Sequence, residues 1–309
     1  MVKILSYIAG LFFLLVSLTL YYYDKTEIKN TCGVRMLTSS SFYAGLGEDL
    51  KGLYFKKYKC QLKFDVVNGA NLISNLFIKQ PSRYDVLVGL DQFQIDKLDS
   101  KLLWNLEALN LSDSITKNNY YIAYDEAPIT FFLREPIMKE FKDLISFFEF
   151  AKNNKISIAV PLKTTSVLGA VFDLWLTQNN SLEIKKLPQI KYVKSWSESF
   201  GLFERKIVDG FLSFETSEIY YLNNLKIKKV IIQKGHPNLK EYFAFSKEAR
   251  ISLKQKSEFA DFINSKEVQS LILEKNYMWP AYDLDHKNKN LRNLKLIELD
   301  SHNSFETVN

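Results

Sequence analysis

The stretch KSWSESFGLFERKIVDGFLSFETSEIYY, residues 194–221, predicts a helix, a tight turn and a strand. Ser197 is expected to cap the helix, because its hydroxyl can accept a hydrogen bond from a first-turn N–H group. Apolar side chains then recur at helical spacing along one face: Phe200, Phe203 and Ile207. The Asp209-Gly210 pair ends this helix, and a strand begins over Phe211–Phe214.

Two polar corners with flanking aromatic side chains lie at the ends of these elements, at Trp196-Ser197 and at Phe214–Ser217. Open α/β sheets present ligand-binding groups at such corners. The stretch therefore predicts one side of a binding site, and an ordinary helix–strand unit is the alternative.

The composition is that of a globular protein. The chain has 309 residues, of which 47% are hydrophobic and 14% aromatic, so it can hold two domains with real cores. The net charge of +6 is spread along the chain without a basic block, which argues against a nucleic-acid-binding protein. The chain has two cysteines and three histidines (His236, His286, His302), and their spacing does not match that of metal ligands. A metal site built on Cys or His is therefore not expected, and neither is a cofactor.

The N-terminus carries an export signal. Lys3 is followed by a largely apolar run over residues 4–23 that ends in three tyrosines, which suit a membrane interface. No small-residue cleavage site follows, and the residues before Cys32 do not resemble a lipoprotein signal. An uncleaved membrane anchor within residues 1–32 is the favoured hypothesis, and a cleaved signal is the alternative.

Three expected strands, Val34–Thr38, Gln61–Val67 and Tyr84–Leu90, alternate with two helical patterns. This order predicts a parallel sheet with right-handed crossovers. Polar residues follow the strands, at the edge where such sheets bind ligands: Ser39, Ser40, Ser41, Asn68 and Asp91.

Cys32 and Cys60 precede the first two of these strands. If the strands are neighbours, the two cysteines lie close together at the opposite edge, and an exported chain would oxidise them. We therefore expect a disulfide, with two unrelated cysteines as the alternative.

A second lobe is predicted between two crossing segments, Tyr120–Leu133 and Glu241–Ser246. Thr165 and Ser166 precede a helix whose N-terminus would attract phosphate or carboxylate, although simple capping explains them equally well. The expected domains are residues 33–124 plus 245–309 and residues 125–244. Two hinged α/β lobes around a central cleft are typical of ligand-binding proteins that close by hinge bending.

Four short motifs, YDVLVGLDQ (84–92), KSWSESFGLF (194–203), LSFETSEIY (212–220) and NYMWP (276–280), occur in this order along the chain. In them the chain resembles the thiamine-binding periplasmic proteins of ABC transporters, within the type II solute-binding family. The resemblance implies a two-lobed periplasmic-binding-protein-like fold, a periplasmic monomer, and capture of thiamine or a thiamine phosphate for an ABC permease.

The resemblance also implies ligand contacts, with aromatic rings against the cationic thiazolium and hydroxyl and N–H groups for a phosphate: Asn68, Gly69, Thr165, Ser166, Trp196, Phe214, Glu215, Thr216, Ser217, Tyr220 and Tyr277. The chain departs from the family after the first strand, where Ser39 and Ser40 stand in place of a tyrosine and an aspartate. Glu215 replaces a threonine, and its charge favours a cationic ligand.

Several alternatives remain at this stage. Tyr220-Tyr221 resembles the adjacent tyrosines with which related proteins chelate Fe(III), and a polyamine or another organic cation is a further candidate. A membrane-tethered sensor would use the same cleft to signal. An enzyme is not expected, because the chain has no GxSxG, HExxH or Walker-type motif, and Asp91 and Asp125 are better explained as a helix cap or a hinge carboxylate.

Overall fold

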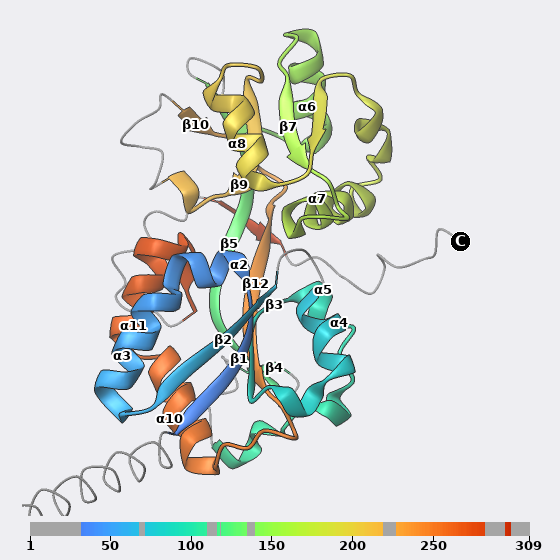
Figure 1. The fold of residues 1–309 in the computed structure, drawn as a ribbon. Coiled ribbons are helices and arrows are strands. Elements are labelled where there is room, and N and C mark those ends of the chain that lie inside the picture. The colour runs from blue at the N-terminus through green and yellow to red at the C-terminus, as the bar shows by residue number, and fades with distance from the viewer. Residues whose placement is uncertain are drawn as a thin grey trace, which may run out of the picture.

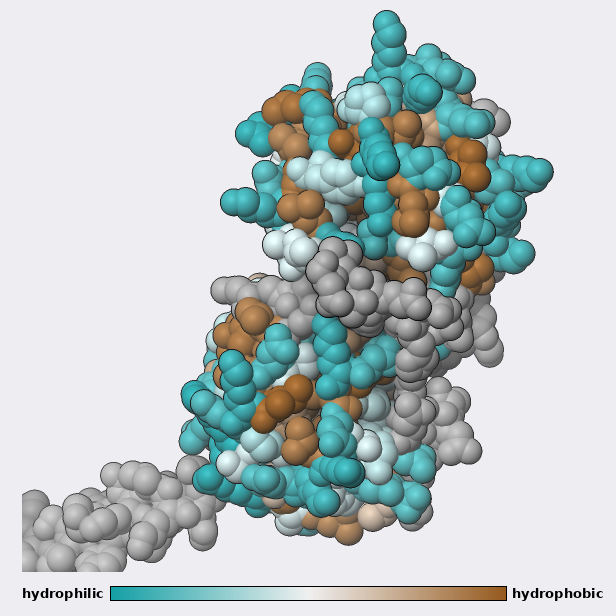
Figure 2. Space-filling view, turned by 90° about the vertical axis from the view of Figure 1, so that its right-hand side faces the viewer, coloured by the Kyte–Doolittle hydropathy of each residue, from teal (hydrophilic) through white to brown (hydrophobic). Residues whose placement is uncertain are grey.

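The computed structural model describes residues 32–67, 72–109, 116–117, 119–134, 140–218, 227–281 and 294–297. Two lobes, each with its own helices, are joined by strands that run through both (Figure 1). The space-filling view shows the same two bodies, with hydrophilic side chains over most of the coloured surface and hydrophobic ones in small groups (Figure 2).

The first lobe is built on three parallel strands, β1 (Gly33–Ser39), β2 (Gln61–Val67) and β3 (Val86–Asp91). All six residues of β3 are buried, as expected for a central strand with both faces covered. Helices lie on both sides of these strands (Figure 1). They are α3 (Glu48–Tyr58), α10 (Leu253–Ile263) and α11 (Lys266–Leu271) on one side, and α4 (Leu72–Lys79) and α5 (Gln92–Ile95) on the other.

The second lobe is built on β7 (Ile158–Pro161), β8 (Ile190–Val193) and β9 (Gly210–Phe214). Strand β7 pairs in parallel with both neighbours. The helices of this lobe are α6 (Leu144–Asn153), α7 (Val167–Gln178) and α8 (Trp196–Glu204). Close packing against β5 explains the glycine at position 210, because an added Cβ would lie only 2.7 Å from the carbonyl oxygen of Phe132.

Strands β5 (Tyr121–Arg134) and β12 (His236–Phe245) connect the lobes. They pair with each other in antiparallel register, while β12 also pairs with β3 and β5 with β9. The sheet order β2-β1-β3-β12-β5-β9-β7-β8 therefore passes without a break from one lobe to the other.

Shorter elements complete the described parts. They are α2 (Ser40–Phe42), β4 (Thr116–Lys117), β6 (Glu140–Phe141), β10 (Ile227–Lys229), β11 (Ile231–Ile232), β13 (Trp279–Pro280), β14 (Leu296–Ile297), the π-helical turns Tyr43–Gly47 and Ile272–Asn276, and the 3-10 turns Pro81–Arg83, Ser100–Leu102, Leu106–Leu109 and Leu182–Lys186.

The hydrophobic core changes from one lobe to the other within the crossing strands. On β5, Ala127 packs in a first-lobe cluster and Ile129 in a second-lobe cluster. On β12, Leu239 belongs to the second lobe and Tyr242 to the first. These changes lie within a few residues of the boundaries expected at 124/125 and 244/245, which remain a prediction.

Local details differ from the sequence expectations. Helix α8 is capped by Ser195, whose side chain accepts from the Glu198 N–H, so Ser197 is not the cap and Trp196 is the first helical residue. Ile207 lies beyond the helix and is 46% exposed. Strand β12 begins at His236, five residues before the expected crossing segment, because Asn238–Lys240 also pair with β5 and the two residues before them pair with β14.

Cys32 and Cys60 form a disulfide, with their Cα atoms 4.9 Å apart. The β1–β2 register explains this proximity, since Gly33 lies opposite Gln61, one residue after each cysteine. The predicted anchor, residues 4–23, lies outside the described residues. Within the described ranges, no helix is both long enough and apolar enough to cross a membrane.

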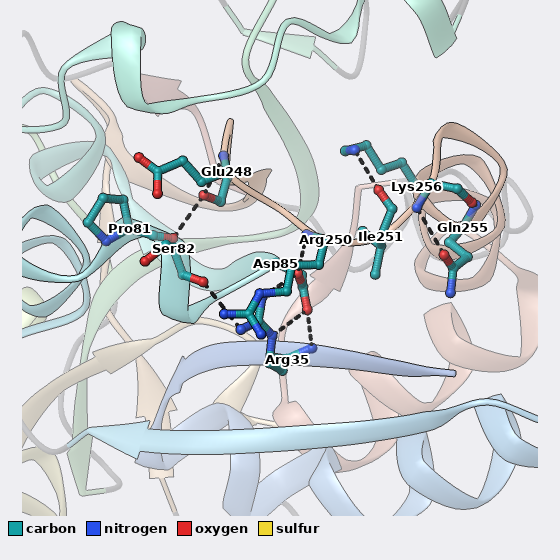
Figure 3. Close-up of polar contacts among 11 residues, drawn as sticks. Arg35, Pro81, Ser82, Asp85, Glu248, Arg250, Ile251, Gln255 and Lys256 are labelled. Atoms are coloured by element: carbon teal, nitrogen blue, oxygen red, sulfur yellow. Dashed lines mark hydrogen bonds and ion pairs between the residues drawn. The ribbon is translucent and has the colours of Figure 1, made fainter. Parts of the chain in front are cut away.

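A polar network around Asp85 links β1, the start of β3 and the segment after β12 in the first lobe (Figure 3). The side chain of Arg35 binds both carboxylate oxygens of Asp85, at 2.9 and 2.7 Å, and the backbone N–H of Arg250 donates to Asp85 Oδ1 at 2.8 Å. Burial acts to raise the pKa of the Asp85 carboxyl, but the hydrogen bonds from Arg35 and Arg250 outweigh burial and hold that pKa below its ordinary value.

His236 is buried where β12 begins in the second lobe. Its Nε2 accepts the Ile232 N–H at 2.8 Å, so Nδ1 carries the proton and donates to the Ile129 carbonyl at 2.9 Å. Burial lowers the pKa of His236 to about 4, so the ring is neutral and structural at physiological pH.

Replacing Asp85 with Asn should lower the free energy of unfolding by about 2 to 4 kcal/mol, because the buried end of the Arg35 ion pair loses its charge. The carboxylate stabilises the fold above its unfolded-state pKa of ~3.9, and this contribution is lost as the pH falls through the lower folded-state pKa. Urea unfolding of wild type and Asp85→Asn at pH 7 and pH 3 measures both effects.

The matched control is Asp261→Asn, which makes the same chemical change at an exposed position on α10. It should stay within about 0.5 kcal/mol of wild type. Equal stability of the two variants at pH 7 would show that the network contributes nothing.

Candidate functional site

The carboxyl ends of parallel strands carry most of the predicted site residues. In the first lobe, Ser39 ends β1 and Asp91 ends β3. In the second lobe, Thr165 and Ser166 follow β7, Trp196 follows β8, and the Glu215–Ser217 turn follows β9. Each set thus lies at one edge of its own lobe, as the strand order requires.

The serine run forms a compact turn. Ser39 caps α2, with its Oγ accepting the Phe42 N–H at 3.2 Å and lying 3.0 Å from Ser41 Oγ. Ser39 and Ser40 are partly exposed and Ser41 is exposed. This side of the candidate site therefore offers hydroxyl groups, without an aromatic ring at these three positions.

Asp91 serves as the cap of α5. Its Oδ1 accepts the N–H groups of Phe93 and Gln94 at 2.8 and 2.9 Å, and its Oδ2 accepts from the Gln94 side chain at 3.2 Å. Burial raises the pKa of Asp91 despite these hydrogen bonds. Asp91 is thus a helix cap, and the hydrogen bonds that it accepts occupy both carboxylate oxygens.

The loop before α7 is tied to the loop before α8. Thr165 donates its hydroxyl proton to the Lys194 carbonyl at 2.6 Å. Ser166 is the N-cap residue of α7, but its side chain makes no capping hydrogen bond. The first-turn N–H groups of this twelve-residue helix are thus not capped by that side chain, which suits an anion.

Trp196 is oriented by contacts that the sequence did not predict. Its indole N–H donates to Ser213 Oγ at 2.8 Å, and Ser213 Oγ in turn lies 3.1 Å from Ser217 Oγ. The indole ring stacks on Phe200, with centroids 5.8 Å apart and an interplanar angle of 6°. Trp196 remains partly exposed, so a face or edge of the ring is accessible to a ligand.

The Glu215–Ser217 turn is held by buried polar contacts. Glu215 Oε1 binds Lys229 Nζ at 2.5 Å, and its Oε2 accepts the Trp279 indole N–H at 3.1 Å. Thr216 donates to the Tyr277 carbonyl. Since Glu215 is 2% exposed and both of its oxygens are engaged, its charge is balanced inside the protein and does not face a ligand as a free carboxylate.

Lys229 is the cation of this turn. Burial acts to lower the pKa of Lys229, but its contacts with Glu215 and with Glu218, 2.9 Å away, raise the pKa overall. Lys229 therefore stays charged and forms an ion pair with each of the two glutamates.

The remaining predicted residues fall into two groups. Tyr277 and Phe214 are partly exposed, and Tyr277 ends the second π-helical turn in a left-handed conformation with φ of 53°. Asn68, Gly69 and Tyr220 lie outside the described residues. Three supporting residues were missed, namely Ser213, Lys229 and Trp279, although Ser213 lies in the LSFETSEIY motif and Trp279 in the NYMWP motif.

No protein-family model matches the chain. A curated relative, the thiamine-binding periplasmic protein of Salmonella typhimurium, is 25% identical over 266 residues, covering 80% of both chains. A second, from Escherichia coli, is 24% identical over 264 residues, covering 79% of both. Among solved structures, a periplasmic thiamin binding protein superposes with a TM-score of 0.72 at 20% identity, covering 89% of this chain and 92% of that one.

The chain is a homologue of thiamine-binding periplasmic proteins with the type II solute-binding fold. This homology supports a periplasmic location and a binding protein rather than an enzyme. The fold is shared more widely: the apo ferric ion-binding protein A of Pasteurella haemolytica has a TM-score of 0.69 at 10% identity, covering 88% of this chain and 93% of that one. Among the described residues, no group of three or more His, Cys, Asp or Glu side chains is arranged to hold a metal ion.

Replacing Lys229 with Met should lower the free energy of unfolding by about 3 kcal/mol, because Glu215 is left as a buried charge without its cation. Adding Glu215→Gln to Lys229→Met should recover much of this loss, since a neutral amide needs no counter-charge. Urea unfolding of the two single variants and the double variant completes the cycle. Additive effects of the two substitutions would show that the side chains do not interact.

Proposed function

We propose that the chain is the periplasmic solute-binding subunit of an ABC transporter and captures thiamine or a thiamine phosphate. The observation that carries this proposal is the similarity to two thiamine-binding proteins over about four fifths of the chain. The two lobes, residues 33–124 plus 245–309 and residues 125–244, would close on the ligand by bending near β5 and β12 and then dock on the permease. We also propose a monomer held near the membrane by residues 4–23.

Apart from Tyr277, the described members of the proposed binding set follow the carboxyl ends of strands in the two lobes. The first lobe would contribute Ser39, Ser40, Ser41, Asn68, Gly69, Asp91 and Tyr277, and the second Thr165, Ser166, Trp196, Phe214, Thr216, Ser217 and Tyr220, while Glu215 would support the turn. Trp196 would stack on the cationic or aromatic part of the ligand, an interaction that contributes about 0.5 to 2 kcal/mol. The open N-terminus of α7 would hold a phosphate.

Glu215 has a different role in this proposal from the one that its sequence position suggests. Its carboxylate orders the turn after β9 through Lys229 and Trp279. Its neighbours Thr216 and Ser217 are thereby held at fixed positions, so Glu215 supports the site without touching the cation.

Isothermal titration of the purified protein should detect binding of thiamine or thiamine phosphate in preference to spermidine and Fe(III). A heat of binding observed with spermidine alone would indicate a polyamine-binding protein, and one observed with Fe(III) alone would indicate an iron-binding protein. Binding of none of the four would reject the proposed ligand class.

Trp196→Ala should weaken thiamine binding tenfold or more, about 1.4 kcal/mol, because the ring that stacks on the ligand is lost. The matched control is Tyr192→Ala, which removes a 40% exposed ring from the neighbouring β8. Titration of both variants, together with thermal unfolding, separates lost contact from lost stability. Unchanged affinity of Trp196→Ala would remove this residue from the site.

A further inference from the structure

Three carboxylates form a row across the sheet where it passes between the lobes. Glu241 on β12 lies opposite Asp91 at the end of β3 and, on its other side, opposite Asp125 of β5. Asp91 marks the carboxyl edge of the first-lobe strands. The register therefore places Glu241 and Asp125 at the same level, at the carboxyl edge of the first-lobe strands, where open α/β sheets bind ligands.

The three carboxylates are enclosed and receive few hydrogen bonds beyond those that cap α5. Asp125 is fully buried; its Oδ2 accepts from the Asn276 side chain at 3.0 Å, whereas its Oδ1 has no hydrogen-bond partner. Glu241 Oε2 accepts the Tyr124 hydroxyl proton at 2.6 Å. Glu241 is the one member of the row with partial solvent exposure, so it is the one that a ligand can reach.

No lysine or arginine of the described residues forms an ion pair with any of the three. The neighbouring charges do not compensate for this. Glu126, next to Asp125 on β5, adds a further negative charge, and Lys97 acts on Asp91 only through space. Tyr124 from β5 and Asn276 from the second π-helical turn are neutral donors.

An uncompensated row of this kind retains protons. Burial and the charge of Glu241 raise the pKa of Asp125 well above its ordinary value. Burial, opposed by the Tyr124 hydrogen bond and assisted by the charge of Asp91, raises the pKa of Glu241 to about 7. In the free protein near neutral pH, the Asp125–Glu241 pair is therefore expected to retain a proton.

We propose that Glu241 is the acidic contact for the cationic group of the ligand, and that a bound cation displaces a proton from the Asp125–Glu241 pair into solvent. The inference rests on the proposed function, because it requires a cationic organic ligand in the same cleft. It assigns charge recognition to the crossing strands, whereas Glu215 is neutralised by Lys229. Asp125 acts through Glu241 and is a positioning residue.

The alternative is a structural hinge pair whose proton never exchanges with a ligand. Proton release on ligand binding distinguishes a ligand contact from a structural pair, because a structural proton stays in place when the ligand binds. The sign of the pH dependence follows: the ionised pair binds a cation better than the protonated pair, so affinity should rise from pH 6 to pH 8.

The experiment is isothermal titration with thiamine and with spermidine at pH 7, in phosphate and in Tris, which differ in ionisation enthalpy. Wild type should release protons and show a buffer-dependent enthalpy. Glu241→Gln should lose that dependence, bind the cation at least tenfold more weakly and lose the rise in affinity with pH. The control is Glu248→Gln, the same change at an exposed position just after β12, which should behave as wild type.

Each outcome decides between the proposals. Wild type that binds either cation without proton release, with Glu241→Gln of equal affinity, overturns the role of Glu241 and leaves the proposed function intact. Proton-linked binding of spermidine but not thiamine keeps the role of Glu241 and overturns the thiamine assignment. Binding of neither cation overturns both. If Glu241→Gln does not fold, Glu241→Asp, which keeps the charge, and the pH dependence of wild-type affinity provide the test.

Discussion

The antiparallel pairing of β5 with β12 is the interaction on which the arrangement of the lobes depends. Both strands run through both lobes, and each pairs outward with a strand of one lobe, β12 with β3 and β5 with β9. The cores on the two sides change over within these strands. A bend between the lobes must therefore occur in backbone that is hydrogen-bonded on both edges, and the register irregularity at Glu241/Tyr242 is where that ladder is already interrupted.

Polar contacts converge on this crossing from both lobes. The turn after β9 reaches the segment after α11 through Thr216 and Tyr277 and through Glu215 and Trp279. Asn276 in the same segment donates to Asp125 of β5. The turn after β9 is thus connected, through hydrogen bonds to the segment after α11, to the crossing strand β5.

The sequence predicted the three parallel strands of the first lobe, helix α8 and strand β9, because their apolar periodicity is strong and polar residues or an Asp-Gly pair mark their ends. It also predicted which residues follow the strands, since the polar ends of buried strands stand out in an apolar run. It did not predict the partners of those residues. The charge of Glu215 pointed to a cationic ligand, but Lys229, fourteen residues later, neutralises it through a contact that only the fold creates. Ser195 and Ser197 are equally good caps by residue type, and the backbone geometry decides between them.

Strand β12 carries two titratable groups, His236 and Glu241, whose contributions to stability change with pH in opposite directions. His236 has a folded-state pKa of about 4, below its unfolded value of ~6.5, so it destabilises the fold as the pH falls through this window. Glu241 has a folded-state pKa of about 7, above its unfolded value of ~4.3, so it destabilises the fold as the pH rises through nearly the same window. The two slopes have opposite signs. As the pH rises, the loss at Glu241 is therefore partly offset by the gain at His236, whereas Asp91 and Asp125, whose pKa values burial also raises, add to the loss.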